Sequence, residues 1–121
     1  MKLSYHIEDK HAEKFISLLV LGVLQALDKK LISIDEAEGF IFKPYVSDLL
    51  ETIKSSKELS KIIIDGCLLD DVKDLIPDKL QGEIDALIER TSSVIRNSKE
   101  IGRLVEKEIR VVGKGINEGG M

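Results

Sequence analysis

Residues 15–27 read Phe-Ile-Ser-Leu-Leu-Val-Leu-Gly-Val-Leu-Gln-Ala-Leu, which is the longest apolar run in the chain. A helix needs about 20 apolar residues to cross a bilayer, so this run is too short and predicts a helix buried in a globular domain. Its apolar side chains fall on nearly every face, which is typical of the central helix of a bundle. We therefore expect a central helix over about residues 9–30. Four of its leucines are expected in the core: Leu18, Leu19, Leu24 and Leu27.

The residues before this helix alternate in polarity. Apolar Leu3, Tyr5 and Ile7 are separated by polar side chains, and a period of two predicts a short β-strand. A single strand needs a partner, and the β-branched stretch Ile109 to Val112 is the best candidate. The alternative is an extended arm without a partner.

Capping residues and prolines divide the segment that follows. Ser33 and Glu36 have the spacing of a capping box, which predicts a short helix from Ile34. Pro44 disfavours helical geometry at the residue before it, so one helix should end there and another begin. After a turn at Ser55 and Ser56, the next helix is expected over about 57–67.

In the last part of the chain, apolar residues recur at intervals of seven. We expect Asp78 to cap a helix there, with Gln81 at the matching position of a capping box. The apolar rows of residues 84–112 predict a broad stripe that packs on a bundle. Whether residues 78–112 form one helix or two, with a break near Asn97, is left open. The glycine-rich residues 113–121 are expected to form a flexible tail.

Together these patterns predict a mainly α fold, a compact helical bundle around the central helix, with a small two-stranded β pair. The chain has 121 residues, enough for one domain, placed at 1–112. The net charge is −4, and acidic side chains dominate the middle of the chain, so we expect neither nucleic-acid nor membrane binding. The single cysteine excludes an intrachain disulfide and, without a secretory signal, predicts a cytoplasmic protein.

No pattern of catalytic or metal-binding residues stands out. His6 and His11 are the only histidines, and their spacing matches no recurrent zinc motif. Cys67 is followed closely by Asp70 and Asp71, whose charge would raise its pKa and disfavour a nucleophilic thiolate. We therefore expect no cofactor, no metal and no catalytic residue.

A run of aspartates is the one candidate functional feature. Asp65, Asp70, Asp71, Asp74 and Asp78 are opposed only by Lys73 in the sequence. They predict either helix caps on a solvated face or a docking patch for a basic partner, whose association complementary charge would speed and orient.

Several segments resemble a known family. They are residues 15–22, residues 31–38, the Pro44–Tyr45 pair and residues 66–72. Their wording resembles a family of short, mostly Gram-positive bacterial proteins, catalogued as a domain of unknown function, over about residues 2–95. The resemblance implies a bacterial cytoplasmic protein and transfers no catalytic residue.

The leading functional hypothesis is a non-enzymatic protein–protein interaction domain. One version is an immunity-type protein that covers the basic cleft of a toxin. The alternative is a homodimeric scaffold that pairs through residues 84–112. An enzyme remains a third hypothesis, with Tyr5, His6, Glu8 and His11 as its polar group.

Overall fold

The N-terminal half of the molecule begins with a strand and is otherwise helical. The structure, a computed structural model, describes residues 1–53, 55–102 and 109–113. The elements of this half are β1 (Lys2–Tyr5), α1 (Asp9–Asp28), α2 (Ile34–Phe40) and α3 (Pro44–Thr52). Those that follow are α4 (Lys57–Cys67), α5 (Leu69–Leu75), the 3-10 turn η1 (Pro77–Lys79), α6 (Leu80–Arg96) and β2 (Ile109–Val112).

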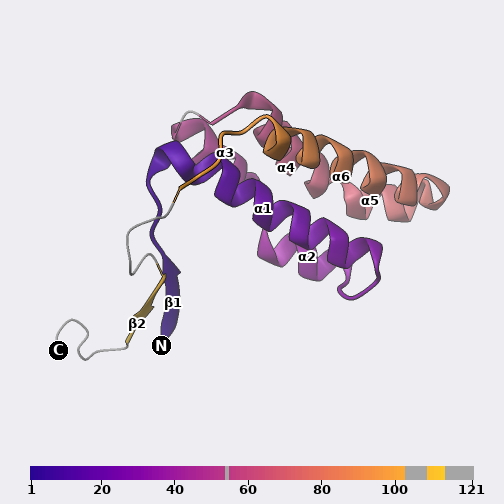
Figure 1. Ribbon diagram of the computed structural model, residues 1–121. Coiled ribbons are helices and arrows are strands. Elements are labelled where there is room, and N and C mark those ends of the chain that lie inside the picture. Colours follow the sequence, from indigo (N-terminus) through magenta and orange to yellow (C-terminus); the bar gives the residue numbers. More distant parts are fainter. Residues whose placement is uncertain (54, 103–108, 114–121) are drawn as a thin grey trace.

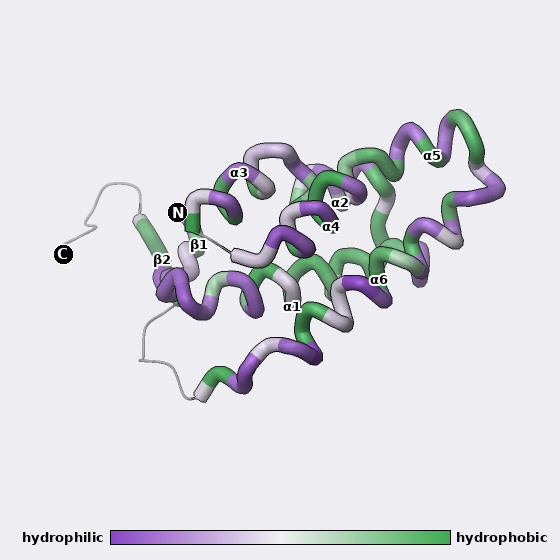
Figure 2. The backbone as a smooth tube through the Cα atoms, turned by 90° about the horizontal axis from the view of Figure 1, so that it is seen from above, coloured by the Kyte–Doolittle hydropathy of each residue, from purple (hydrophilic) through white to green (hydrophobic). Residues whose placement is uncertain are grey.

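The long helices α1 and α6 lie side by side, and α4 packs on α6 (Figure 1). The helix α2 contacts both α1 and α5, while α3 packs on α4. Figure 2 shows the apolar stretch of α1 running along the middle of this bundle. The mainly α prediction is therefore confirmed, and the core is formed by Val20, Leu24, Leu27, Ile34, Ala37, Ile41, Phe42, Leu50, Leu59, Ile62, Ile63, Leu69, Ile84, Leu87 and Val94.

Local signals account for most helix ends. The Ser33 hydroxyl accepts a hydrogen bond from the Glu36 backbone amide at 3.0 Å, and Ser56 caps α4 in the same way. Pro44 occupies the first turn of α3, where its missing N–H is not needed. These boundaries agree with the predictions from the sequence.

The end of α1 is a Schellman motif without glycine. The backbone amide of Leu31 donates to the Ala26 carbonyl at 2.8 Å, and that of Lys30 donates to Leu27. Lys30 has φ of 61°, in the left-handed region that favours glycine. The chain therefore reverses at Lys30 and leads into α2.

The prediction that all four leucines of α1 are buried was wrong for two of them. Leu24 and Leu27 are buried, but Leu18 is 52% exposed and Leu19 is 44% exposed. The reason is that α6 and α2 cover only part of the circumference of α1. Leu19→Ala should therefore cost little stability, because most of the loss on truncation arises from burial.

The predicted cap of the last helix was also wrong. Asp78 lies in η1, and α6 begins at Leu80 without a side-chain cap. The side-chain amide of Gln81 instead donates to Asp28 at 2.7 Å and to Asp85 at 2.9 Å. Gln81 therefore links the start of α6 to the end of α1.

The last segment is not one continuous helix. α6 ends at Arg96, next to the break considered at Asn97, and its buried stripe packs inside the bundle. Residues 109–112 form β2, which pairs antiparallel with β1, so the predicted strand pair is confirmed. Val105 of the predicted stripe lies outside the described residues. So do residues 114–121, which make up the greater part of the expected tail. No helix among the described residues is both long and apolar enough to cross a membrane.

Candidate functional site

Four carboxylates from two helices come together where α2 contacts α5. Asp35 and Glu38 lie on α2, and Asp70 and Asp71 lie on the first turn of α5. The pKa of Glu38 is raised, first by partial burial and then by the negative charges of Asp70, Asp35 and Asp71. We refer to these four residues as the carboxylate cluster.

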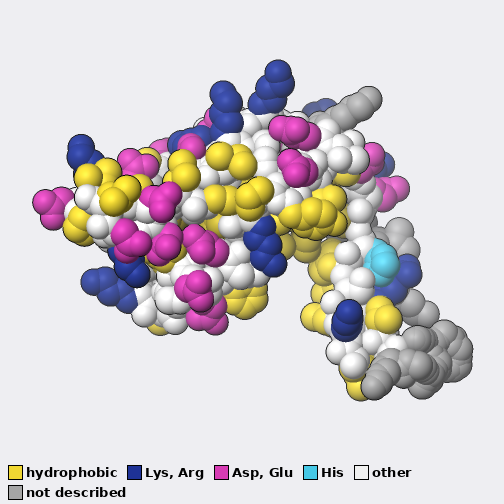
Figure 3. Space-filling model, turned by 180° about the vertical axis from the view of Figure 1, so that it is seen from behind, with side chains coloured by type: hydrophobic (Ala, Val, Ile, Leu, Met, Phe, Trp, Pro, Cys, Tyr) yellow, Lys and Arg dark blue, Asp and Glu magenta, His cyan; other side chains and the backbone are white. Residues whose placement is uncertain are grey.

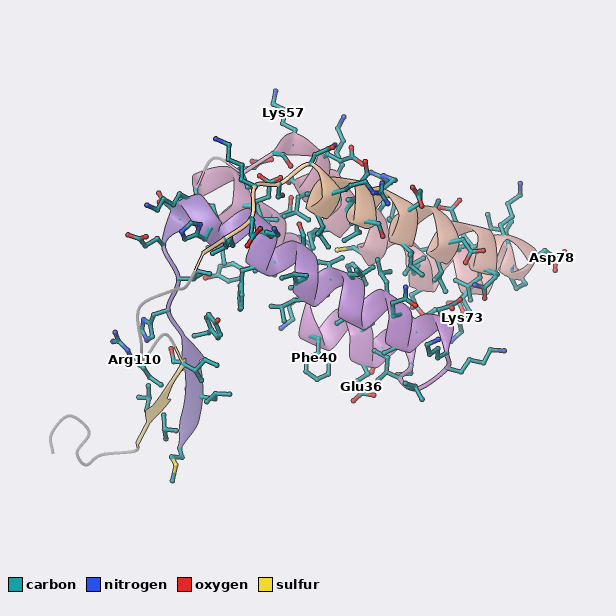
Figure 4. The ribbon with its side chains drawn as sticks, viewed as in Figure 1. Glu36, Phe40, Lys57, Lys73, Asp78 and Arg110 are labelled. Carbon is teal, nitrogen blue, oxygen red and sulfur yellow. The ribbon has the colours of Figure 1, made fainter. Side chains whose placement is uncertain are left out.

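No described cation neutralises this cluster within ion-pairing distance. The ion pairs formed by the described residues join Lys10 to Glu8, Arg90 to Glu58 and Asp65, and Arg96 to Glu89. Figure 4 labels Lys73, the lysine of α5, but it is not part of these pairs. The cluster therefore keeps an uncompensated negative potential at the surface.

The aspartates predicted from the sequence are divided among three places. Asp70 and Asp71 belong to the cluster, and exposed Asp74 follows one turn later in α5. Asp78 lies at the far tip of the bundle (Figure 4). Asp65 is separate, because its carboxylate has a partner inside the bundle.

That partner is Arg90, which joins α6 to α4. Its Nη1 donates to Oδ2 of Asp65 and its Nε donates to Oε2 of Glu58, both at 2.7 Å. Partial burial alone would lower the pKa of Arg90, but the hydrogen bonds to these carboxylates raise it. Asp65 therefore helps to hold two helices together and does not belong to the carboxylate cluster.

Asp35 and Glu38 were missed by the sequence analysis. Their separation of three residues on a helix places them near one face, which was the only local signal. Their nearness to Asp70 and Asp71 depends on the contact between α2 and α5, more than thirty residues apart in sequence.

Exposed apolar side chains also occur on or next to these two helices. Leu68, just before α5, is 49% exposed and lies one helical turn before Asp71. Phe40, at the end of α2, is 65% exposed, but it shares a face with Glu36 rather than with Glu38 (Figure 4). The space-filling view shows yellow and magenta side chains intermixed over one broad face of the bundle (Figure 3).

Other candidate sites offer less chemistry. A groove of about 850 Å³ lies between α3 and α4, and its walls carry charges of both signs. The buried hydroxyls of Ser47 and Ser60 hydrogen-bond to each other at its edge. Among the described residues, no three His, Cys, Asp or Glu side chains are arranged to hold a metal ion.

The thiol of Cys67 is not an activated nucleophile. Its pKa is raised, first by burial and then by the charge of Glu38. A raised pKa leaves the thiol protonated at neutral pH, whereas a nucleophile requires the thiolate. The structure therefore favours a packing role for Cys67.

The N-terminal polar residues considered for an enzyme site contact different partners. The ring of Tyr5 lies 4.4 Å from that of Phe15, measured between centroids. His6 hydrogen-bonds to the hydroxyl of Ser4, and Glu8 pairs with Lys10. These contacts assign no shared chemistry to the group.

Glu38→Gln should raise the free energy of unfolding at neutral pH. Because the pKa of Glu38 is raised in the folded protein, the folded state binds the Glu38 proton more tightly than the unfolded state does. The stabilisation that comes from this proton is fully present below the unfolded pKa of about 4.3, and it is lost as pH rises through the folded pKa. Glutamine removes this loss, and we expect a gain below about 1 kcal/mol because the side chain is partly exposed.

Urea unfolding of both proteins at pH 4 and pH 7 measures this effect. The stability difference between Glu38→Gln and the parent chain should be larger at pH 7. Glu83→Gln, on the exposed side of α6, is the matched control and should show no such difference. Equal effects of Glu38→Gln at the two pH values would contradict the electrostatic account.

These observations define a class: a small mainly α bundle with a two-stranded arm and an acidic surface. Comparison with family models assigns the chain to the family described as protein of unknown function (DUF3969), over residues 8–110. The chain belongs to this family, and the match extends past residue 95, where the resemblance was expected to end. Comparisons with curated proteins and with solved structures gave no match.

Proposed function

We propose that this protein is a non-enzymatic docking domain that binds a basic protein partner through the carboxylate cluster. The observation that carries the proposal is the convergence of Asp35, Glu38, Asp70 and Asp71 without a described cation in an ion pair. Like charges held together destabilise the free protein slightly. Lysine or arginine side chains of a partner would relieve that repulsion, so the arrangement favours a complex.

An apolar neighbour of the cluster supplies the second part of the proposal. Exposed Leu68, one helical turn before Asp71, can be covered by a partner, which contributes affinity, while the carboxylates contribute orientation and association rate. An immunity-type protein that covers the basic cleft of a toxin is the specific form we favour. We place its action in the cytoplasm, on the basis of the single free cysteine.

The alternative of a homodimer paired along the whole of residues 84–112 has less support. Ile84, Leu87 and Val94, the part of its apolar stripe that lies on α6, are buried inside the chain. That part of the stripe already packs in the bundle and is not available to a second copy.

Neutralising the cluster should slow association with a cationic polypeptide. The test variant carries Asp35→Asn, Glu38→Gln, Asp70→Asn and Asp71→Asn, and polylysine serves as the probe in a stopped-flow measurement. At low ionic strength the association rate should fall by about tenfold, and its salt dependence should weaken, because surface charge steers encounter.

The matched control changes the net charge equally at exposed positions elsewhere: Asp9→Asn, Asp48→Asn, Glu51→Gln and Glu83→Gln. Its association rate should stay much closer to that of the parent chain. If the association rate fell by the same factor in both variants, total charge rather than the cluster would govern binding, and the proposal would be wrong. Circular dichroism should show the same helix content for all three proteins.

A further inference from the structure

The two strands form a ribbon that projects from the helical bundle (Figure 1). In its register Leu3 lies opposite Val111 and Tyr5 lies opposite Ile109. Cross-strand partners share a face and alternate residues change face. The ribbon therefore has one continuous apolar face, which these four side chains form.

This apolar face is largely uncovered. Leu3 is 74% exposed, Val111 64% and Ile109 56%. A two-stranded ribbon is marginally stable by itself in water and normally needs a third strand or a helix against its apolar face. Among the residues that the structure describes, the ribbon therefore lacks the packing that would stabilise it in the single chain.

A second uncovered apolar strip lies on α1. Phe15, Leu18, Leu19 and Gly22 have the spacing of a single helix face, and the two leucines are about half exposed. Seen from behind, apolar side chains border both sides of the notch between the bundle and the projecting ribbon (Figure 3).

The stacked rings of Tyr5 and Phe15 join these two surfaces at the base of the notch. Their centroids lie 4.4 Å apart with an interplanar angle of 30°. Because Tyr5 belongs to the apolar face of the ribbon, that face turns towards the strip on α1. Near the tip of the ribbon, Leu3 and Val111 nevertheless remain exposed, so the two surfaces do not cover each other within one chain.

We propose that a second copy of this chain occupies the notch, with the ribbon of each copy packed on the α1 strip of the other. A two-fold dimer uses the same patch on both copies and requires it to be self-complementary. Here the apolar face of the ribbon and the apolar strip on α1 belong to the same patch. One two-fold rotation therefore places the ribbon of each copy on the α1 strip of the other.

The available area suits a dimer of this kind. Six side chains contribute most of it: Leu3, Tyr5, Leu18, Leu19, Ile109 and Val111. Each exposes on the order of 100 Å², so two copies would bury roughly 1,200 Å², the lower end of the range for specific interfaces.

The proposed contact is built by β1, β2 and α1. The dimer surface is therefore distinct from the carboxylate cluster, which is built by other helices.

Sedimentation equilibrium of the full chain at micromolar concentrations tests the dimer directly. The parent chain should have twice the mass of one copy, and Leu18→Lys and Val111→Asp should each weaken self-association by at least about tenfold, because each places a charge in the apolar contact. Leu75→Lys, at a 78% exposed position on α5, is the control and should remain dimeric.

Mixing the two variants distinguishes this arrangement from other dimers. A Leu18→Lys copy paired with a Val111→Asp copy has one unaltered contact and one contact in which lysine faces aspartate. The mixture should therefore dimerise more tightly than either variant alone. A monomeric parent chain, or dimers that persist in both single variants, would overturn the proposal whatever the outcome for the carboxylate cluster.

Discussion

Leu24→Ala should lower the free energy of unfolding by about 2–5 kcal/mol, the range found for leucine truncation in well-packed cores. Leu24 has no exposed surface and lies in the main apolar cluster of the bundle. Truncation removes apolar contacts and leaves a cavity, because neighbouring helices relax only partly. Urea denaturation followed by circular dichroism measures this loss.

Leu31→Ala is the matched control, because it makes the same chemical change at a position that is 72% exposed. It should cost less than about 0.5 kcal/mol, as is usual for surface substitutions. If Leu24→Ala cost no more than this control, α1 would not form part of the core. The packing of α1 against α6 would then have to be revised.

Gly66→Ala should destabilise the protein by about 1–3 kcal/mol, the usual cost of overpacking a filled core. Gly66 is buried in α4, and a Cβ at this position would overlap the ring of Phe42. Phe42 is itself only 3% exposed, so its ring has little room to move. Alanine ordinarily stabilises a helix relative to glycine by about 1 kcal/mol, and this gain offsets only part of the steric cost.

Gly82→Ala, the same substitution at another helical position, should have the opposite effect on stability. No other side chain of the described residues lies near a Cβ at Gly82 in α6, so the substitution should stabilise the protein by about 0.5–1 kcal/mol. Combining Gly66→Ala with Phe42→Leu should cost less than the two single changes added together, because the smaller side chain makes room. Additive losses would show that the overlap with the ring is not the cause.

Local sequence signals were sufficient for most helix boundaries. The start of α3 at Pro44 follows from the fixed geometry of proline, and the start of α4 follows from the cap at Ser56. Both effects act within a single turn of helix, so no knowledge of distant residues is needed. The cap predicted at Asp78 failed because the chain forms η1 before α6, and the side chain of Gln81 binds Asp28 instead.

The candidate surface was predictable only in part. Asp70 and Asp71 stand out in the sequence because they belong to a run of five aspartates with a single lysine, Lys73, among them, and the structure places them in the cluster. Asp35 and Glu38 could not be assigned, because only the contact between α2 and α5 brings them to the same place. The docking role of these residues stays a prediction until binding is measured.

Local patterns in the sequence were enough to predict that the chain is helical, where most helices begin, and that residues 2–5 and 109–112 can pair as strands. The side of α1 that is covered depends on the packing of the whole chain, which leaves Leu18 and Leu19 exposed while Leu24 is buried. That packing also decides that Asp65 pairs with Arg90 rather than joining the other aspartates. Helix formation depends on neighbours within a few residues, whereas coverage and ion pairing depend on where helices distant in sequence come to rest against one another.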